Sequence, residues 1–160
     1  MRKTTLVRER GETRPVAYVC HGEKYQYVDR EERSKTRVIG PTGIRGHLQF
    51  GPTTPGPFGE VVGLIEESKV VFRYRPWGSV EPGRHALDVR YEGAEYVLVS
   101  RGRRPTPHLE SIDGTTLAVF GSRKGRLASS TTPQEGVLAA LIAASGIANI
   151  TLPQSWAARH

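Results

Sequence analysis

One long stretch of this chain carries no charge. From Gly136 to Ala158 the sequence has no Asp, Glu, Lys or Arg, although 24% of all residues are charged. A helix start precedes the apolar run: Thr132 suits the N-cap, Pro133 suits the first helical position, and Glu135 completes a capping box. The sequence therefore predicts a helix that begins at Pro133.

The predicted helix is apolar on every side. No polar stripe with a period near 3.6 runs between Val137 and Ala144, and Ser145-Gly146 supplies a stop signal. A helix that is apolar all round is buried on all sides. We therefore expect a buried helix over about residues 133–145. Its strongly apolar part is shorter than the ~20 residues of a membrane span, so a transmembrane helix is disfavoured.

Composition bounds the class of protein. A chain of 160 residues is most simply one domain. The 18 glycines and 11 prolines favour many turns over long helices. The net charge of +7 favours an anionic partner, such as a membrane surface or a nucleic acid, and the plain alternative is a basic surface without a specific partner.

The single cysteine, Cys20, excludes an internal disulfide. The residues after Met1 include no apolar run of signal-peptide length. We therefore expect a cytoplasmic protein. We also expect that it attaches to the surface of a membrane, as a peripheral protein.

Nearly every segment before the helix has the short β-branched or aromatic pattern of a strand. Twelve strands are predicted, near Thr4–Glu9, Val16–Cys20, Tyr25–Val28, Thr36–Ile39, Arg45–Phe50, Val61–Ile65, Val70–Tyr74, His85–Tyr91, Tyr96–Ser100, His108–Ile112, Leu117–Phe120 and Arg126–Ser129. Asp113-Gly114 predicts a tight hairpin turn. The Gly/Pro-rich region 40–59 is interpreted as a wandering surface connection in preference to a mobile lid.

Many short strands and one all-apolar helix pose a packing problem. A sandwich would cover one face of the helix, whereas a closed or nearly closed barrel covers every face and removes exposed strand edges. The predicted fold is therefore a mainly antiparallel β-barrel around the helix, formed by residues 1–153 as a single domain, with residues 154–160 as a C-terminal tail.

This pattern resembles the tubby-like C-terminal superfamily, which includes the tubby domain, the phospholipid scramblases and the LURP-one-related proteins. The resemblance lies in Gly114–Ala148, where the strand pair Thr116–Phe120 and Gly125–Ser129 precedes the helix Pro133–Gly146. It implies a barrel around a hydrophobic central helix. It also implies lipid binding, since tubby domains bind phosphoinositides and scramblases act on membranes.

No catalytic motif, metal-ligand spacing or cofactor fingerprint is found, so neither an enzyme nor a cofactor is predicted. Cys20 and His21 point to opposite faces of a strand and cannot act as a nucleophile and its base. The five histidines are scattered along the chain. A site assembled from distant strands stays open as an alternative.

The basic residues give the best functional hypothesis. In an up-and-down meander, alternate turns lie at the same end of the sheet, so the loops after Tyr74, Ser100 and Phe120 would meet. The candidate anion-binding residues gathered there are Arg101, Arg103, Arg104, Arg123, Lys124 and Arg126, with Trp77 beside them. The opposite end would gather Glu92, Glu95 and Asp113.

A cationic end with a tryptophan suits anionic phospholipid headgroups. The leading hypothesis is a non-enzymatic module that binds such a surface. One alternative is a nucleic-acid-binding barrel, which needs exposed aromatic residues and has as candidates Tyr25, Tyr27, Tyr74, Tyr91 and Tyr96. A barrel that binds a small molecule or a protein partner is the other alternative.

Overall fold

The structure is a computed structural model. It describes residues 3–8, 17–20, 23–27, 35–40, 43–49, 60–74, 86–101, 106–121, 124–128, 130–145 and 147–148. The strands in chain order are β1 (Lys3–Arg8), β2 (Ala17–Cys20), β3 (Glu23–Tyr27), β4 (Lys35–Ile39), β5 (Arg45–Gln49), β6 (Glu60–Ile65), β7 (Ser68–Tyr74), β8 (Ala86–Tyr91), β9 (Ala94–Arg101), β10 (Thr106–Ser111), β11 (Thr116–Val119) and β12 (Lys124–Ala128). One helix follows, α1 (Pro133–Ser145).

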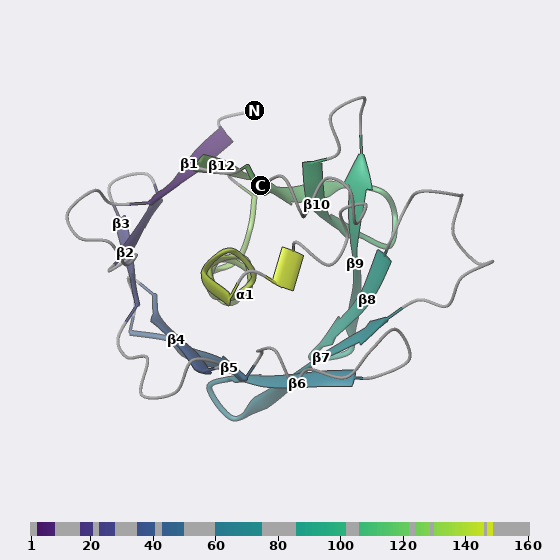
Figure 1. Ribbon diagram of the computed structural model, residues 1–160, viewed down its shortest axis with the longest axis horizontal. Coiled ribbons are helices and arrows are strands. Elements are labelled where there is room, and N and C mark those ends of the chain that lie inside the picture. Colours follow the sequence, from purple (N-terminus) through teal and green to yellow (C-terminus); the bar gives the residue numbers. More distant parts are fainter. Residues whose placement is uncertain are drawn as a thin grey trace.

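The strands from β4 to β12 form a contiguous antiparallel sheet in which each strand pairs with the next. This sheet curls around α1 (Figure 1). On the remaining side, β3 pairs with β4 and β2 pairs with β3, while β1 pairs with both β2 and β12. The prediction of a mainly β, barrel-like fold around a C-terminal helix is confirmed.

Two of the hairpin turns depend on residues with positive φ. In the turn between β8 and β9, Glu92 has a φ of 49° and Gly93 a φ of 76°, the pattern of a two-residue turn that follows the strand twist. In the turn between β6 and β7, Glu66 has a φ of 53°. These short turns set the pairing of β6 with β7 and of β8 with β9.

The turn between β10 and β11 is wider than the tight Asp113-Gly114 turn predicted from the sequence. Only Gly114 has a positive φ there, 89°. The Gly114 N–H donates to the Ser111 carbonyl at 2.9 Å, and the Ser111 N–H donates to the Thr115 carbonyl at 2.9 Å. The Asp113 carboxylate accepts hydrogen bonds from the Ser111 hydroxyl and the Thr115 N–H, which hold this wider turn.

The ends of α1 form as the sequence predicts. The Thr132 N–H donates to Glu135 Oε1 at 2.9 Å, and the Glu135 N–H donates to Thr132 Oγ1 at 3.2 Å. This reciprocal pair is a capping box. The helix ends at Ser145, whose hydroxyl donates to the Ile142 carbonyl at 3.4 Å and accepts from the Ile147 N–H at 3.3 Å.

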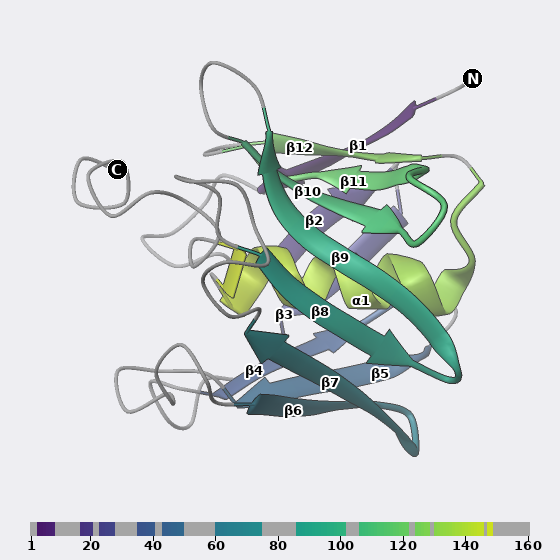
Figure 2. The same cartoon turned by 90° about the vertical axis from the view of Figure 1, so that its right-hand side faces the viewer.

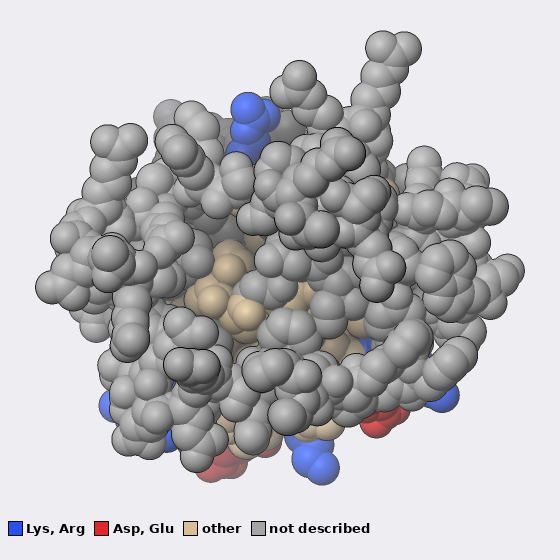
Figure 3. Space-filling model, in the orientation of Figure 1, with Lys and Arg blue, Asp and Glu red and all other residues tan. Residues whose placement is uncertain are grey.

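Burial of α1 is complete from Gly136 to Ile142. Pro133 is exposed, and Gln134, Glu135 and the last three residues of the helix are only half-buried, so the prediction of a buried helix over 133–145 is wrong for its first and last turns. These turns lie at the two ends of the barrel (Figure 2). In the view along the barrel, the described residues visible near the centre are neither basic nor acidic, and most of the described charged residues that can be seen lie at the rim (Figure 3).

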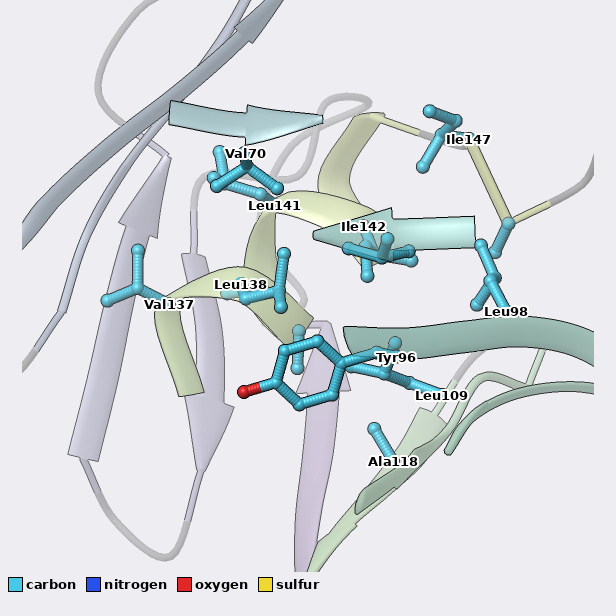
Figure 4. Packing of buried hydrophobic residues seen from close by; sticks show 14 of the residues in the cluster. Val70, Tyr96, Leu98, Leu109, Ala118, Val137, Leu138, Leu141, Ile142 and Ile147 are labelled. Atoms are coloured by element: carbon cyan, nitrogen blue, oxygen red, sulfur yellow. The ribbon is translucent and has the colours of Figure 1, made fainter. Parts of the chain in front are cut away.

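The helix packs closest to β4 and β5. A Cβ at Gly46 of β5 would lie 2.8 Å from both Leu141 Cδ1 and Val137 Cγ1, so any other residue would force these side chains of the helix to shift. On the other side, larger side chains such as Tyr96, Leu98 and Leu109 fill the space between helix and wall (Figure 4).

Two predictions lie largely outside the described residues. In the Gly/Pro-rich region, β5 forms near its expected place, but the choice between a lid and a surface connection concerns mainly residues 50–59, which the structure does not describe. The predicted tail, residues 154–160, also lies outside the description.

Candidate binding surface

The strands β7 to β12 form the uninterrupted meander on which the predicted basic surface depends. Tyr74 of β7 pairs with Leu87 of β8, and Arg101 of β9 pairs with Thr106 of β10. In the last pair, Val119 of β11 lies opposite Arg126 of β12. The strand ends that flank the three predicted basic loops therefore lie at one end of the sheet, which we call the loop end (Figure 2).

Three of the predicted binding residues fall within the described strands. Arg101 is the last residue of β9 and Lys124 is the first of β12. Arg126 is exposed, two residues further along β12. All three backbone positions lie at or near the loop end.

The other predicted binding residues, Trp77, Arg103, Arg104 and Arg123, lie outside the described residues, as do the side chains of Arg101 and Lys124. That these groups gather into one cationic surface stays a prediction.

The opposite end, which we call the turn end, holds the turns between β6 and β7, β8 and β9, and β10 and β11 (Figure 2). Glu92, Glu95 and Asp113 lie there, as predicted. The further carboxylates of this end are Glu66, Glu67 and Glu135.

Hydrogen bonds tie the turn-end carboxylates to neighbouring strands. The Arg45 N–H donates to Glu66 Oε1 at 3.2 Å, and the Ser68 hydroxyl donates to Glu92 Oε1 at 2.9 Å. Hydrogen bonds from the Ser111 hydroxyl and then from Thr115 lower the pKa of Asp113 from 3.8 to about 2. Such bonds to the charged form make the carboxylate a stronger acid.

Two buried tyrosines lie near this end. Burial, followed by the charges of Glu92 and Glu66, raises the pKa of Tyr91 above 10.0. Burial and the hydrogen bond to Glu135 raise the pKa of Tyr96. Tyr91 and Tyr96 are only 5% and 6% exposed, so they cannot stack on nucleic-acid bases. The burial removes two of the five aromatic candidates for the nucleic-acid alternative, and the side chains of Tyr25, Tyr27 and Tyr74 lie outside the description.

One contact between ionisable side chains was not predicted from the sequence. His108 and Glu110 lie on the same face of β10, with His108 Nδ1 3.9 Å from Glu110 Oε2, and their side chains are 23% and 8% exposed. The signal in the sequence was their spacing, because residues two apart on a strand lie on the same face of the sheet. Within the described part of the chain, no group of three His, Cys, Asp or Glu residues is placed to hold a metal ion.

In comparisons with known proteins, no family model, no curated protein and no solved structure matches this chain. Among the described residues, no helix combines the length and the apolar character that crossing a bilayer requires.

Proposed function

We propose that this protein is a non-enzymatic binding module whose loop end attaches to anionic phospholipid headgroups at a membrane surface. One observation carries the proposal: consecutive antiparallel pairing from β7 to β12 brings the strand ends that flank the three loops with the candidate residues to one end of the barrel.

The chemistry of these loops suits headgroups. Each basic residue near an anionic bilayer contributes about 1 kcal/mol, and a tryptophan is favoured at headgroup depth. The loops supply the cations Arg101, Arg103, Arg104, Arg123 and Lys124, together with Trp77. Arg126 extends the set along β12.

Carboxylates outnumber the exposed cations Arg45, Lys69 and Arg90 near the turn end, and this excess of negative charge supports one docking direction. An anionic surface attracts the cationic loops and repels carboxylates such as Glu67 and Glu92 when they come within a Debye length, about 10 Å at 0.1 M salt. The proposed attachment is therefore peripheral and end-on.

The scaffold in this proposal is a barrel of about twelve strands closed around α1. Pairing of β1 with both β2 and β12 supports the closure. Such a barrel is the fold that a tubby-like relationship implies, and membership of that superfamily is part of the proposal.

The test is co-sedimentation with vesicles of neutral phosphatidylcholine alone or mixed with anionic phosphatidylserine, at low and moderate salt. The loop variant combines Arg103→Glu, Arg104→Glu and Lys124→Glu. Its matched control, Arg45→Glu, Lys69→Glu and Arg90→Glu, makes the same change in net charge with exposed cations near the turn end.

We expect the wild type to bind anionic vesicles, and to bind them less at higher salt. The loop variant should lose roughly 100-fold or more in affinity, since three contributions of about 1 kcal/mol are removed. The control should bind like the wild type. An equal loss of affinity in both variants would contradict the proposal. Displacement of the protein from the vesicles by added single-stranded DNA would also contradict it, and would favour the nucleic-acid alternative.

A further inference from the structure

The position of α1 inside the barrel needs a physical explanation. Gly136 to Ile142 are buried on every side, and apolar burial is non-directional. A slide along the barrel or a rotation about its axis would therefore retain much of the same burial. Hydrophobic contact holds the helix inside, but contacts of fixed geometry must decide where it stops.

One such contact joins the helix to the wall at the turn end. The Tyr96 hydroxyl of β9 donates to Glu135 Oε2 at 3.0 Å. The other oxygen of the same carboxylate accepts the Thr132 N–H at 2.9 Å. One carboxylate thus fixes the first turn of the helix to a wall strand that lies 39 residues away in the sequence. Figure 4 shows the Tyr96 ring lying beside Leu138.

A steric contact fixes the helix from another wall strand. Gly46 of β5 admits Leu141 and Val137 closer than any other residue would allow. The tyrosine contact lies at the start of the helix and the glycine contact near its middle, and they come from different strands. Together they determine both the rotation and the axial position of α1.

The axial position matters at the opposite end of the barrel. The helix has 13 residues, about 20 Å, and runs from the turn end to the loop end (Figure 2). After its last residue the chain is held by the hydrogen bond from the Ile147 N–H to Ser145 Oγ, with Ile147 and Ala148 buried. A shift of the helix therefore moves these residues at the loop end.

We propose that Tyr96 and Glu135 are positioning residues: their hydrogen bond pins α1 at the turn end and thereby sets where Ser145, Ile147 and Ala148 lie at the loop end. This hydrogen bond acts on the conformation of the protein, and its role does not depend on what the loop end binds. Buried polar contacts that select one arrangement among several apolar ones are an established use of such pairs.

The test is amide hydrogen exchange and amide chemical shifts by nuclear magnetic resonance. Tyr96→Phe keeps the ring and removes the hydroxyl, and Glu135→Ala removes the acceptor. Glu135→Gln is the conservative variant, because the glutamine carbonyl oxygen keeps the capping-box acceptor while its amide NH2 can donate to the Tyr96 oxygen, which preserves the contact with its direction reversed. Tyr91→Phe is the matched control, since Tyr91 is another buried tyrosine near the same end.

We expect Tyr96→Phe to speed exchange of the α1 amides roughly five- to tenfold, the size of one net hydrogen bond. It should also shift the amide signals of Ile147 and Ala148, which a purely local loss at Tyr96 would not move. Glu135→Ala should cause the same shifts, and Glu135→Gln should restore them. Unmoved signals in folded Tyr96→Phe, or equal shifts in Tyr91→Phe, would overturn the proposal whether or not vesicles are bound.

Discussion

Single residues hold this fold at places where a side chain meets a specific partner. Asp113 stabilises its turn through its ionised carboxylate, and Gly46 allows the helix to approach the wall. Each of these roles predicts the outcome of one substitution.

The pKa of Asp113 predicts a loss of stability in acid. Its folded value of about 2 lies below its ordinary value of 3.8, so the ionised form stabilises the folded protein. That contribution is complete above about pH 4 and is lost as the pH falls towards 2. The melting temperature of Asp113→Asn should therefore lie below that of the wild type at pH 5, with the gap closing at pH 2. A gap in melting temperature that stays constant across this range would count against the assignment.

Gly46→Ala should destabilise the protein by about 1–3 kcal/mol, the usual cost of overpacking a core. The added methyl would lie 2.8 Å from Leu141 Cδ1 and Val137 Cγ1. Urea unfolding measures the loss, and Lys69→Ala on the exposed surface is the control. A Gly46→Ala protein as stable as this control would show that α1 does not pack against β5 so closely.

At the scale of elements, α1 and its caps are the part of the fold most completely determined by local sequence. Thr132, Pro133 and Glu135 predict the first turn, and the structure begins the helix at the same residue. The hairpins follow in the same way from the pattern of short strands and turn residues. Each of these signals lies within a few neighbouring residues.

The capping box predicts a graded response at Thr132. Thr132→Ala should cost about 1 kcal/mol, because the Glu135 N–H loses its acceptor, whereas Thr132→Ser should be nearly neutral. Urea unfolding of the two variants measures the difference. Equal stability of the two would mean that the cap contributes little.

What the sequence could not predict depends on contacts between distant elements. The pairing of Leu109 and Glu110 with β11 shifts by one residue, and no local pattern marks that shift. The Tyr96–Glu135 hydrogen bond exists only because the wall curls around the helix. For the candidate site, the sequence predicts a meander that places three loops at one end, and the strand pairing agrees. That the side chains of these loops gather into one surface is a prediction, because they lie outside the described residues.

At the scale of the whole molecule, the proposed closure of the barrel requires β1 to pair with β12. Lys3 of β1 lies opposite Ala128 of β12. In a Cys20→Ser background, Lys3→Cys with Ala128→Cys should form a disulfide, since residues paired across antiparallel strands have suitable Cα spacing. The disulfide would close a loop from residue 3 to residue 128, and a disulfide that closes so long a loop should stabilise the protein by several kcal/mol.

The matched pair for the closure test is Thr4→Cys with Ala128→Cys. Thr4 lies opposite Leu127 and is therefore one position out of register with Ala128, and successive positions on a strand belong to opposite faces of a sheet. Non-reducing electrophoresis should show the cross-link in the first pair alone. Similar yields in both pairs, or none in either, would contradict a β1–β12 register of this kind.

The central claim is that the loop end, and not the turn end, meets an anionic membrane. The most direct measurement is tryptophan quenching by vesicles of brominated anionic lipid. The first protein carries Trp156→Phe, so Trp77 is its only tryptophan. The second protein carries Trp77→Phe, Trp156→Phe and Ile112→Trp, so its only tryptophan lies at position 112. That position reports from the turn end, where Ile112 is 72% exposed. We predict strong quenching of Trp77 and little at position 112. Quenching at position 112 equal to or greater than that of Trp77, or none at either position, would contradict the proposed orientation.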